Sequence, residues 1–310
     1  MSALVRLGGS DVEVPALSLG TWSWGDERYW QFDHERDTPG VVEAFLASAD
    51  AGLLVDTAEV YGEGASERML GFMASRYEAR PVLVATKFGL LPGRTARTLP
   101  RALAASLRRL KRDAVDLHQI HWADASRASI ASLMDALADV HAAKLVRAVG
   151  VSNFTADELR RAHAELARRG VPLATCQVRY GLLDRAIETN GVFAACRELG
   201  VTLLAYSPLA QGVLAGSYDA ATAPSGARAT EPWFSERALA AARPLVARLR
   251  AIGERHRVAP SAVALRWVIE RGAVPIAGAR RGEHARANLA ALSFALDPAE
   301  LAVLDAATAP

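Results

Sequence analysis

Short apolar runs rich in β-branched residues alternate along the chain with longer stretches in which apolar residues recur every three or four positions. The first pattern is typical of buried strands and the second of amphipathic helices. Strands are predicted over residues 17–20, 53–57, 82–87, 114–121, 146–151, 174–178, 202–206 and 274–278. Helices are predicted over residues 39–51, 65–76, 99–111, 126–142, 155–169, 186–199, 236–256 and 283–291.

Eight strand–helix units in about 290 residues match a closed (β/α)8 barrel better than an open doubly wound sheet. We therefore predict an α/β fold in which residues 1–310 form a single barrel domain. Residues 4–14, around Gly8 and Gly9, are predicted to form an N-terminal β-hairpin that closes the bottom of the barrel. Residues 298–306 are predicted to form an extra C-terminal helix outside it.

Two predicted connections are unusually long for a compact domain. Residues 21–38 follow the first strand and are rich in aromatic side chains, and residues 207–235 follow the seventh. Long loops of this kind are usually lids or binding loops. Both leave the carboxyl ends of their strands, which is the face where barrel enzymes build their active sites.

Composition and charge narrow the classes of partner. The 36 basic and 34 acidic residues leave a net charge of +2, which gives no field for holding nucleic acid or an anionic membrane. Cys176 and Cys196 lie in apolar stretches and offer neither a disulfide framework nor a metal-binding pair. Without a signal peptide or an apolar span, we expect a cytoplasmic monomer or small homo-oligomer.

Polar residues recur at the predicted strand ends, about one β/α unit apart. One such residue alone is usually a helix cap or a loop anchor. Because the carboxyl ends of all the strands meet at one rim, the whole set is predicted to converge on one site. The set comprises Asp56, Lys87, His121, Ser152, Asn153, Gln177, Tyr206 and Ser207.

Asp56 and Lys87 end adjacent strands, and an ion pair is the least costly arrangement for charges in such apolar surroundings. Tyr61 follows closely enough to swing back over the rim. An ammonium about 4 Å away is worth on the order of 4 kcal/mol at an effective dielectric of 20. It could lower the phenol pKa by up to roughly 3 units from its usual value of about 10. Tyr61 is thus predicted to be a general acid.

Two histidines lie in the fourth strand, and alternation places them on opposite faces. His121 ends the strand and is predicted to reach the mouth of the barrel. His118 is predicted to pack toward the helix layer.

The same residues sit in motifs that resemble the aldo-keto reductase superfamily, in order along nearly the whole chain. The resemblance implies a TIM-barrel oxidoreductase that transfers a hydride from NADPH to an aldehyde or ketone. It implies a catalytic tetrad of Asp56, Tyr61, Lys87 and His121, with Tyr61 as the acid or base. The matching motifs include Asp56-Thr57-Ala58-Glu59-x-Tyr61-Gly62, Thr86-Lys87, Ile120-His121-Trp122, Gly150-Val151-Ser152-Asn153-Phe154, Gln177-x-x-Tyr180 and Tyr206-Ser207-Pro208-Leu209.

The resemblance also implies where the cofactor binds. Asn and Gln supply the paired donors and acceptors that an amide needs, and an aromatic ring suits a flat pyridine. Two arginines just before the last barrel helix suit a 2′-phosphate, which favours NADPH over NADH. The implied cofactor residues are Thr21, Trp22, Asp56, Ser152, Asn153, Gln177, Tyr206, Ser207, Leu209, Gln211, Gly212, Gly278, Arg280, Arg281, His284 and Asn288.

Substrate and adenine contacts are less closely defined. Ala287 stands where the family usually has an acidic residue, which leaves the contact to the adenine amino group open. The Trp-rich loop is most similar to general aldehyde and pyridoxal reductases, and an aromatic open end favours an apolar or aromatic carbonyl compound. The candidate substrate residues, each of which could instead pack the loops, are Trp22, Trp24, Trp30, Phe88 and Trp122.

Three other functions fit parts of the sequence. A Rossmann dehydrogenase is disfavoured because Glu67 occupies the third glycine position after Gly62 and Gly64 and would repel pyrophosphate. A metal-dependent hydrolase is disfavoured because the histidines face apart and Lys87 would repel the ion, so no metal is expected. An NADP(H)-binding regulatory subunit with little turnover stays open as the alternative.

Overall fold

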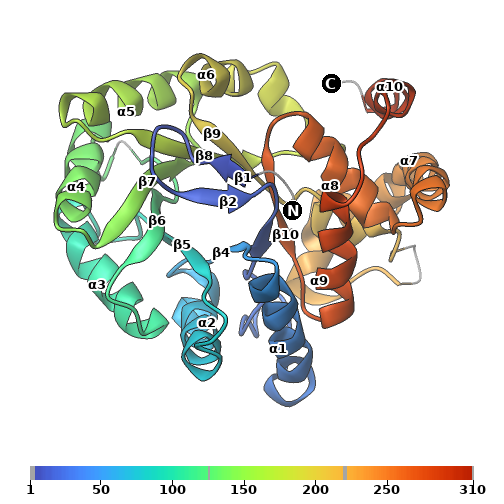
Figure 1. Ribbon diagram of the computed structural model, residues 1–310, viewed down its shortest axis with the longest axis horizontal. Helices are drawn as coiled ribbons and strands as arrows, with labels where there is room; N and C mark the ends of the chain where they lie inside the picture. Colours follow the sequence, from blue (N-terminus) through green and yellow to red (C-terminus); the bar gives the residue numbers. More distant parts are fainter. Residues whose placement is uncertain (1–3, 125, 219–221, 309–310) are drawn as a thin grey trace.

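The structure, a computed structural model, describes residues 4–124, 126–218 and 222–308. Eight parallel strands close a barrel in the order β10-β3-β4-β5-β6-β7-β8-β9, with helices around it (Figure 1). The predicted (β/α)8 TIM barrel is confirmed, and the ends of the predicted 1–310 domain lie outside the described residues. The strands are β3 (Ser18–Gly20), β4 (Leu54–Asp56), β5 (Leu83–Phe88), β6 (Val115–Ile120), β7 (Val146–Ser152), β8 (Leu173–Arg179), β9 (Thr202–Tyr206) and β10 (Val274–Gly278).

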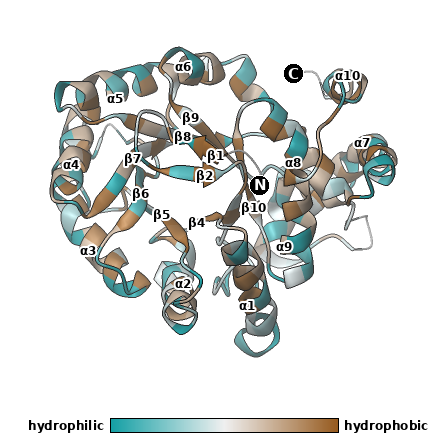
Figure 2. Ribbon diagram, viewed as in Figure 1, coloured by the Kyte–Doolittle hydropathy of each residue, from teal (hydrophilic) through white to brown (hydrophobic). Residues whose placement is uncertain are grey.

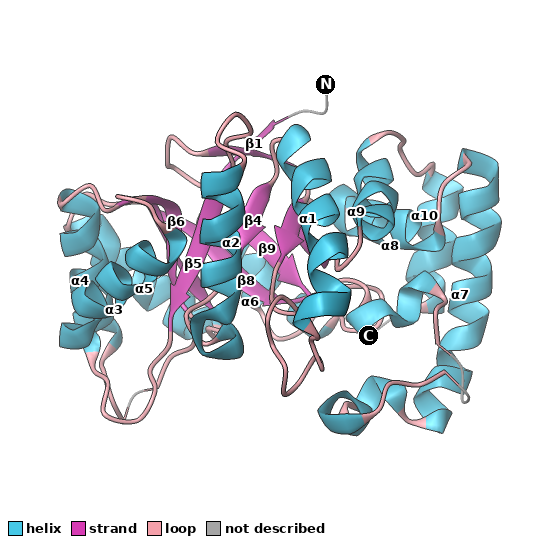
Figure 3. Cartoon of the chain, turned by 90° about the horizontal axis from the view of Figure 1, so that it is seen from below, coloured by secondary structure: helices cyan, strands magenta, loops and turns pink. Residues whose placement is uncertain are grey.

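The predicted N-terminal hairpin is present as antiparallel strands β1 (Leu4–Arg6) and β2 (Glu13–Pro15). Figure 3 shows β1 at one end of the barrel, with long loops extending from the other end. Leu7, Val12 and Val14 are fully buried and pack against inward-facing strand residues such as Leu54 and Leu117. Each buried side chain of this size contributes roughly 1.5–3 kcal/mol, so the hairpin closes the barrel floor and leaves the opposite end for a site.

Most predicted helices form close to their expected bounds, but the helix predicted over 186–199 begins only at Val192, because residues 186–188 form a separate 3-10 turn. Thr155 begins one of them with the expected capping box, in which Glu158 accepts from the Thr155 backbone N–H and hydroxyl. In Figure 2 the helices carry both brown and teal residues, as expected for elements with one buried face. These helices are α2 (Ala65–Arg76), α3 (Leu99–Leu110), α4 (Ile130–Ala142), α5 (Ala156–Arg168), α6 (Val192–Glu198), α7 (Glu236–His256), α9 (Gly282–Leu289) and α10 (Pro298–Ala307).

The helix α1 (His34–Asp50) begins five residues before the predicted start at Pro39. The side chain of Asp33 accepts from the backbone N–H of Arg36 at 2.8 Å and caps the helix there. The sequence pattern places Pro39 at the first helical position, which is the preferred place of proline in a helix. The extra turn shortens the first long loop and brings the start of α1 to the mouth of the barrel.

An unpredicted helix, α8 (Pro260–Glu270), lies between α7 and β10 in sequence. It packs directly against the barrel, whereas α7, predicted as the seventh barrel helix, lies outside it (Figure 1). Residues 261–265, Trp267 and Val268 of α8 are buried, and a short, mostly apolar run of this kind does not by itself distinguish a helix from other buried segments. Among the described residues, no helix is both long and apolar enough to cross a membrane.

Gly71 of α2 provides a test of the helix layer, because α3 ends against it. A Cβ added at Gly71 would run into the carbonyl oxygen of Arg109 and lie 2.7 Å from the carbonyl carbon of Leu110. Helix propensity alone favours alanine over glycine by about 1 kcal/mol. We expect Gly71→Ala to destabilise instead, by about 1–3 kcal/mol, because the clash moves backbone atoms. Urea unfolding measures the sign, and a variant as stable as the wild type would contradict this packing.

Candidate active site

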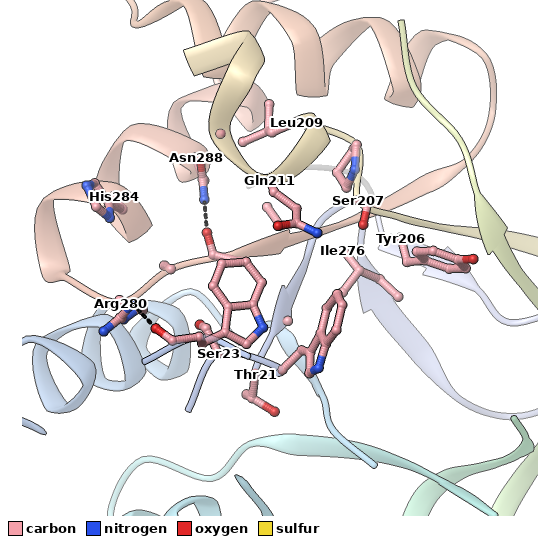
Figure 4. A pocket seen from close by; sticks show the side chains of 18 of the residues that line it. Thr21, Ser23, Tyr206, Ser207, Leu209, Gln211, Ile276, Arg280, His284 and Asn288 are labelled. Carbon is pink, nitrogen blue, oxygen red and sulfur yellow. Dashed lines mark hydrogen bonds between the residues drawn. The ribbon is translucent and has the colours of Figure 1, made fainter. Parts of the chain in front are cut away.

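A cavity of about 1130 Å³ opens at the carboxyl ends of the strands, between the two long loops. Every residue that the sequence assigned to the cofactor lines it. Figure 4 shows Tyr206 at one side of this cavity and Arg280 and His284 at the other, with Gln211 between them. The cavity is therefore extended, with strand-end chemistry at one end and basic residues at the other.

The predicted ion pair is present at the strand-end side. Lys87 of β5 is fully buried, and its Nζ lies 2.5 Å from Oδ1 of Asp56 on β4. The same ammonium donates to the backbone oxygen of Thr57 at 2.9 Å and to Oη of Tyr61 at 3.2 Å. All three protons of the ammonium thus have acceptors, which is what a buried lysine requires.

Tyr61 begins a short turn in which Gly62 has a φ of +54° and Gly64 a φ of +84°. This left-handed backbone turns the chain so that Tyr61 points back over the rim. Burial raises the pKa of the phenol above its ordinary value, although Lys87 acts in the opposite direction. The expectation that Lys87 would give a net lowering was therefore wrong, because the cost of burying a phenolate is larger.

Burial by itself disfavours the charged form of Lys87, but Asp56 and Tyr61 outweigh it and raise the pKa of the ammonium. The lysine therefore stays protonated at neutral pH. A fixed positive charge next to Oη of Tyr61 is the main electrostatic feature of the site.

The histidines separate as the strand alternation predicted. The His121 ring lies 5.8 Å from the Tyr61 ring, nearly perpendicular to it, and lines the cavity. Burial, assisted by Lys87, holds the His121 pKa well below its ordinary value, so the ring is neutral at neutral pH. His118 is 1% exposed on the other face of β6, where burial lowers its pKa to about 4.

A wall of amide and hydroxyl groups continues from the tetrad. Oη of Tyr206 donates to Oδ1 of Asn153 at 2.9 Å, and Nδ2 of Asn153 donates to the backbone oxygen of His121 at 3.0 Å. Oγ of Ser152 donates to the backbone oxygen of Gln177 at 2.8 Å. These bonds join the ends of β6, β7, β8 and β9 and fix the wall in place.

The two arginines predicted at the basic end of the cavity already form ion pairs with acidic side chains. Arg280 is ion-paired with Asp37 and donates to the backbone oxygen of Trp30 at 3.2 Å. Arg281 is exposed and, within the described part of the chain, forms an ion pair only with Glu283, at 2.9 Å. Arg36 and Arg286, which the sequence reading missed, also line the cavity. Arg36 also pairs with Asp37, at 2.9 Å, so two arginines share one carboxylate and this end of the cavity keeps an excess of positive charge.

The five aromatic substrate candidates divide into three groups. Trp22 and Trp30 line the cavity, with their rings 5.4 Å apart. Trp24 and Phe88 are fully buried in the core, and Trp24 donates to the backbone oxygen of Ala279 at 2.8 Å. Trp122 packs beside His121, with the ring centres 4.6 Å apart and the planes tilted by 44°, and does not line the cavity. Alternation alone could not distinguish these cases, since all five lie at or beyond strand ends.

The two long loops meet over the cavity in contacts that the sequence did not reveal. Nε2 of Gln211 donates to Oη of Tyr29 at 2.7 Å, and that hydroxyl donates to Glu231 at 2.7 Å. Arg228 donates to Oε1 of Gln211 at 3.1 Å and lies 4.4 Å from the Trp30 ring centre. Loop length was the one signal available, because no local pattern pairs residues two hundred positions apart.

Comparisons with known proteins agree with this geometry. The model of the aldo/keto reductase family matches residues 16–309. Pyridoxal reductase from Arabidopsis thaliana chloroplasts is 35% identical over 94% of this chain and 82% of its own. The NADH-specific methylglyoxal reductase of Escherichia coli is 28% identical over 97% and 96%. An aldo-keto reductase from Klebsiella pneumoniae, solved with NADPH, superposes with a TM-score of 0.77 at 28% identity, covering all of this chain and 96% of that one.

The buried His118 gives a prediction about acid stability. Its pKa is about 4 in the folded chain against 6.5 unfolded, so the unfolded state binds more protons between these values. Stability therefore falls as pH drops from 6.5 towards 4, by up to about 3 kcal/mol from this group. We expect His118→Leu to remove this slope. Denaturant unfolding at several pH values measures it, and parallel curves for the two proteins would contradict the burial.

Proposed function

Because the chain belongs to the aldo/keto reductase family, we propose that it reduces the carbonyl group of an aldehyde or ketone with NADPH. One observation carries the proposal: a buried ammonium lies 3.2 Å from Oη of Tyr61 at the end of an extended cavity. A phenol held against a fixed positive charge can give up a proton to a ligand and remain stabilised as the anion.

The residues along the cavity fit a nicotinamide dinucleotide. Its volume of about 1130 Å³ exceeds the usual range for small-ligand sites, about 300–1,000 Å³. A Cβ at Gly278 would meet nothing closer than 4.0 Å, so the missing side chain leaves that part of the cavity open. When bound, NADPH supplies the hydride. Ser152, Asn153 and Gln177 would hold its carboxamide, and Tyr206 would stack on the pyridine ring.

The remaining cofactor residues would hold the rest of the dinucleotide. The strand-end loops provide backbone and amide groups along the pyrophosphate stretch, and the basic end suits a phosphate. The Klebsiella structure with NADPH supports this choice, while the NADH-specific relative shows that the family also contains the other preference. These remaining residues are Thr21, Trp22, Asp56, Ser207, Leu209, Gln211, Gly212, Gly278, Arg280, Arg281, His284 and Asn288.

Proton transfer would fall to Tyr61. Its Oη would donate to the carbonyl oxygen of the substrate, and Lys87 would stabilise the phenolate left behind. Neutral His121 lines the same part of the cavity and would orient the carbonyl without competing for the positive charge. Asp56 would keep the lysine in place and protonated.

The substrate end favours a flat, apolar carbonyl compound. Trp22 lies between the Tyr61 ring, 6.1 Å away, and the Tyr29 ring, 4.7 Å away. Together with Trp30 these rings form an aromatic surface next to the proposed acid. The resemblance to pyridoxal reductase supports aromatic aldehydes as the first class to test.

Replacing the proposed acid tests the reaction directly. Tyr61→Phe should cut turnover of 4-nitrobenzaldehyde or pyridoxal by about 10²–10⁴-fold, because the proton donor is lost while the cavity keeps its shape. NADPH affinity, measured by fluorescence titration, should change little. Tyr77→Phe, outside the cavity, is the matched control.

Full activity in Tyr61→Phe would show that the assigned acid is wrong. Tight NADPH binding by the wild type with no turnover of any carbonyl substrate would instead favour the regulatory alternative. A panel of aldehydes and ketones monitored by NADPH absorbance separates these outcomes.

Arg281 gives the sharper test of cofactor preference, because Arg280 is already paired with Asp37. Arg281→Ala should weaken NADPH by about tenfold or more while leaving NADH nearly unchanged, since only NADPH carries the 2′-phosphate. Adding Arg280→Ala to Arg281→Ala should increase the difference between the loss of NADPH affinity and the loss of NADH affinity. Equal losses for both dinucleotides, measured by fluorescence titration, would remove the case for phosphate recognition.

A further inference from the structure

We propose that Gln177 is a positioning residue for proton transfer as well as part of the amide wall. Its side chain holds the second oxygen of Asp56 and thereby sets the contact between Lys87 and Tyr61. The inference rests on the proposed function and adds a link between the cofactor wall and the acid. It follows from one contact that the sequence did not predict.

The contact crosses the interior of the barrel. Nε2 of Gln177 donates to Oδ2 of Asp56 at 2.9 Å, while Oδ1 of the same carboxylate accepts from Nζ of Lys87 at 2.5 Å. Strands β4 and β8, which carry Asp56 and Gln177, are not neighbours in the barrel. Gln177 is 2% exposed and Asp56 is 2% exposed, so water cannot easily replace the bond.

This arrangement clamps the carboxylate from two sides. With Oδ2 held by Gln177, only Oδ1 faces the ammonium, and Nζ remains within 3.2 Å of Oη of Tyr61. Without the amide donor, a buried carboxylate oxygen would lack a partner, and the carboxylate would turn towards the lysine. The ammonium would then move away from the phenol, whose anion would lose its stabilisation.

The same amide has capacity left for a ligand. One N–H of Gln177 is used by Asp56, and no described residue donates a hydrogen bond to its Oε1. The other N–H and Oε1 are therefore available to a carboxamide in the cavity. A ligand that turned the amide would change the Asp56 contact, so occupancy of the wall and the electrostatics of the acid are coupled through one side chain.

Three titratable groups act on the Tyr61 phenol: Asp56 on β4, Lys87 on β5 and Tyr206 at the end of β9. His121 follows β6 and faces the same phenol. Asp56 and Tyr206 disfavour the phenolate, whereas Lys87 favours it. Because His121 is neutral, the balance depends on how closely the ammonium approaches the phenol.

The test uses Gln177→Leu, which removes the donor, and Gln177→Glu, which keeps a donor only when protonated. Gln119→Leu is the matched control, since Gln119 is a fully buried glutamine on β6 that lies opposite Lys87 in the sheet but, among the described residues, accepts from Thr175 and has no hydrogen bond to an ionisable group. Tyr61 ionisation is measured in the cofactor-free protein by near-ultraviolet absorbance, as the difference from the same protein carrying Tyr61→Phe. This readout needs neither cofactor nor substrate.

We expect Gln177→Leu to raise the pKa of the Tyr61 phenol by about one unit or more, the size expected for losing a hydrogen bond to a charged group. Gln119→Leu should leave it unchanged. At saturating NADPH, Gln177→Leu should also lower kcat by about tenfold at neutral pH, beyond any change in cofactor Kd.

Gln177→Glu should behave like the wild type at low pH, where its carboxyl O–H donates to Asp56. It should lose kcat at higher pH, because two carboxylates then face each other and repel the phenolate. This new titration distinguishes positioning from mere packing, and it decides the matter if Gln177→Leu does not fold.

The inference is overturned if phenol ionisation and kcat at saturation match the wild type in Gln177→Leu while only the NADPH Kd rises. It is equally overturned if Gln177→Glu shows no additional titration. Either result would leave the Tyr61→Phe test of the proposed function untouched. Conversely, a raised pKa of the Tyr61 phenol in cofactor-free Gln177→Leu would support the clamp on Asp56 even if no carbonyl substrate were turned over.

Discussion

A lysine ammonium buried inside the barrel imposes the constraint on which the rest of the site depends. Desolvation of such a charge costs several kcal/mol unless its protons find acceptors. Asp56, the Thr57 carbonyl and Tyr61 provide them, from β4 and the turn that follows it. The turn with its left-handed glycines brings Tyr61 to the Lys87 ammonium as its third acceptor, and the same turn places the phenol in the cavity.

Charge balance then decides what the site can do. Burial alone keeps Tyr61 in its protonated form, and Lys87 supplies the opposing influence that makes a transient phenolate tolerable. A phenol that holds its proton until a ligand arrives, beside a charge that stabilises its anion, suits donation to a carbonyl oxygen. The neutral His121 preserves this balance because a second positive charge would compete with the lysine.

The long loops give the cavity its shape on the side away from the core. Tyr29, Gln211 and Glu231 tie together segments that enter from opposite sides of the mouth. The aromatic surface formed by Trp22 and Trp30 lies under these contacts, next to the basic residues at the start of α9. We therefore expect the loops to determine ligand selectivity, while the proposed reacting groups stand at or just beyond rigid strand ends.

The sequence by itself determined the strand order, the hairpin floor, the rim of polar residues and the separation of His118 from His121. These follow from local periodicity, because the carboxyl ends of parallel strands must meet at one edge. Tertiary structure alone decided the rest. It revealed α8, a short and mostly apolar run that the sequence pattern left ambiguous, and the burial of Trp24 and Phe88. The pKa of the Tyr61 phenol is raised rather than lowered, because the cost of desolvation depends on everything that surrounds the side chain. The hydrogen bond from Gln177 to Asp56 crosses the barrel, and no local sequence pattern encodes such a contact.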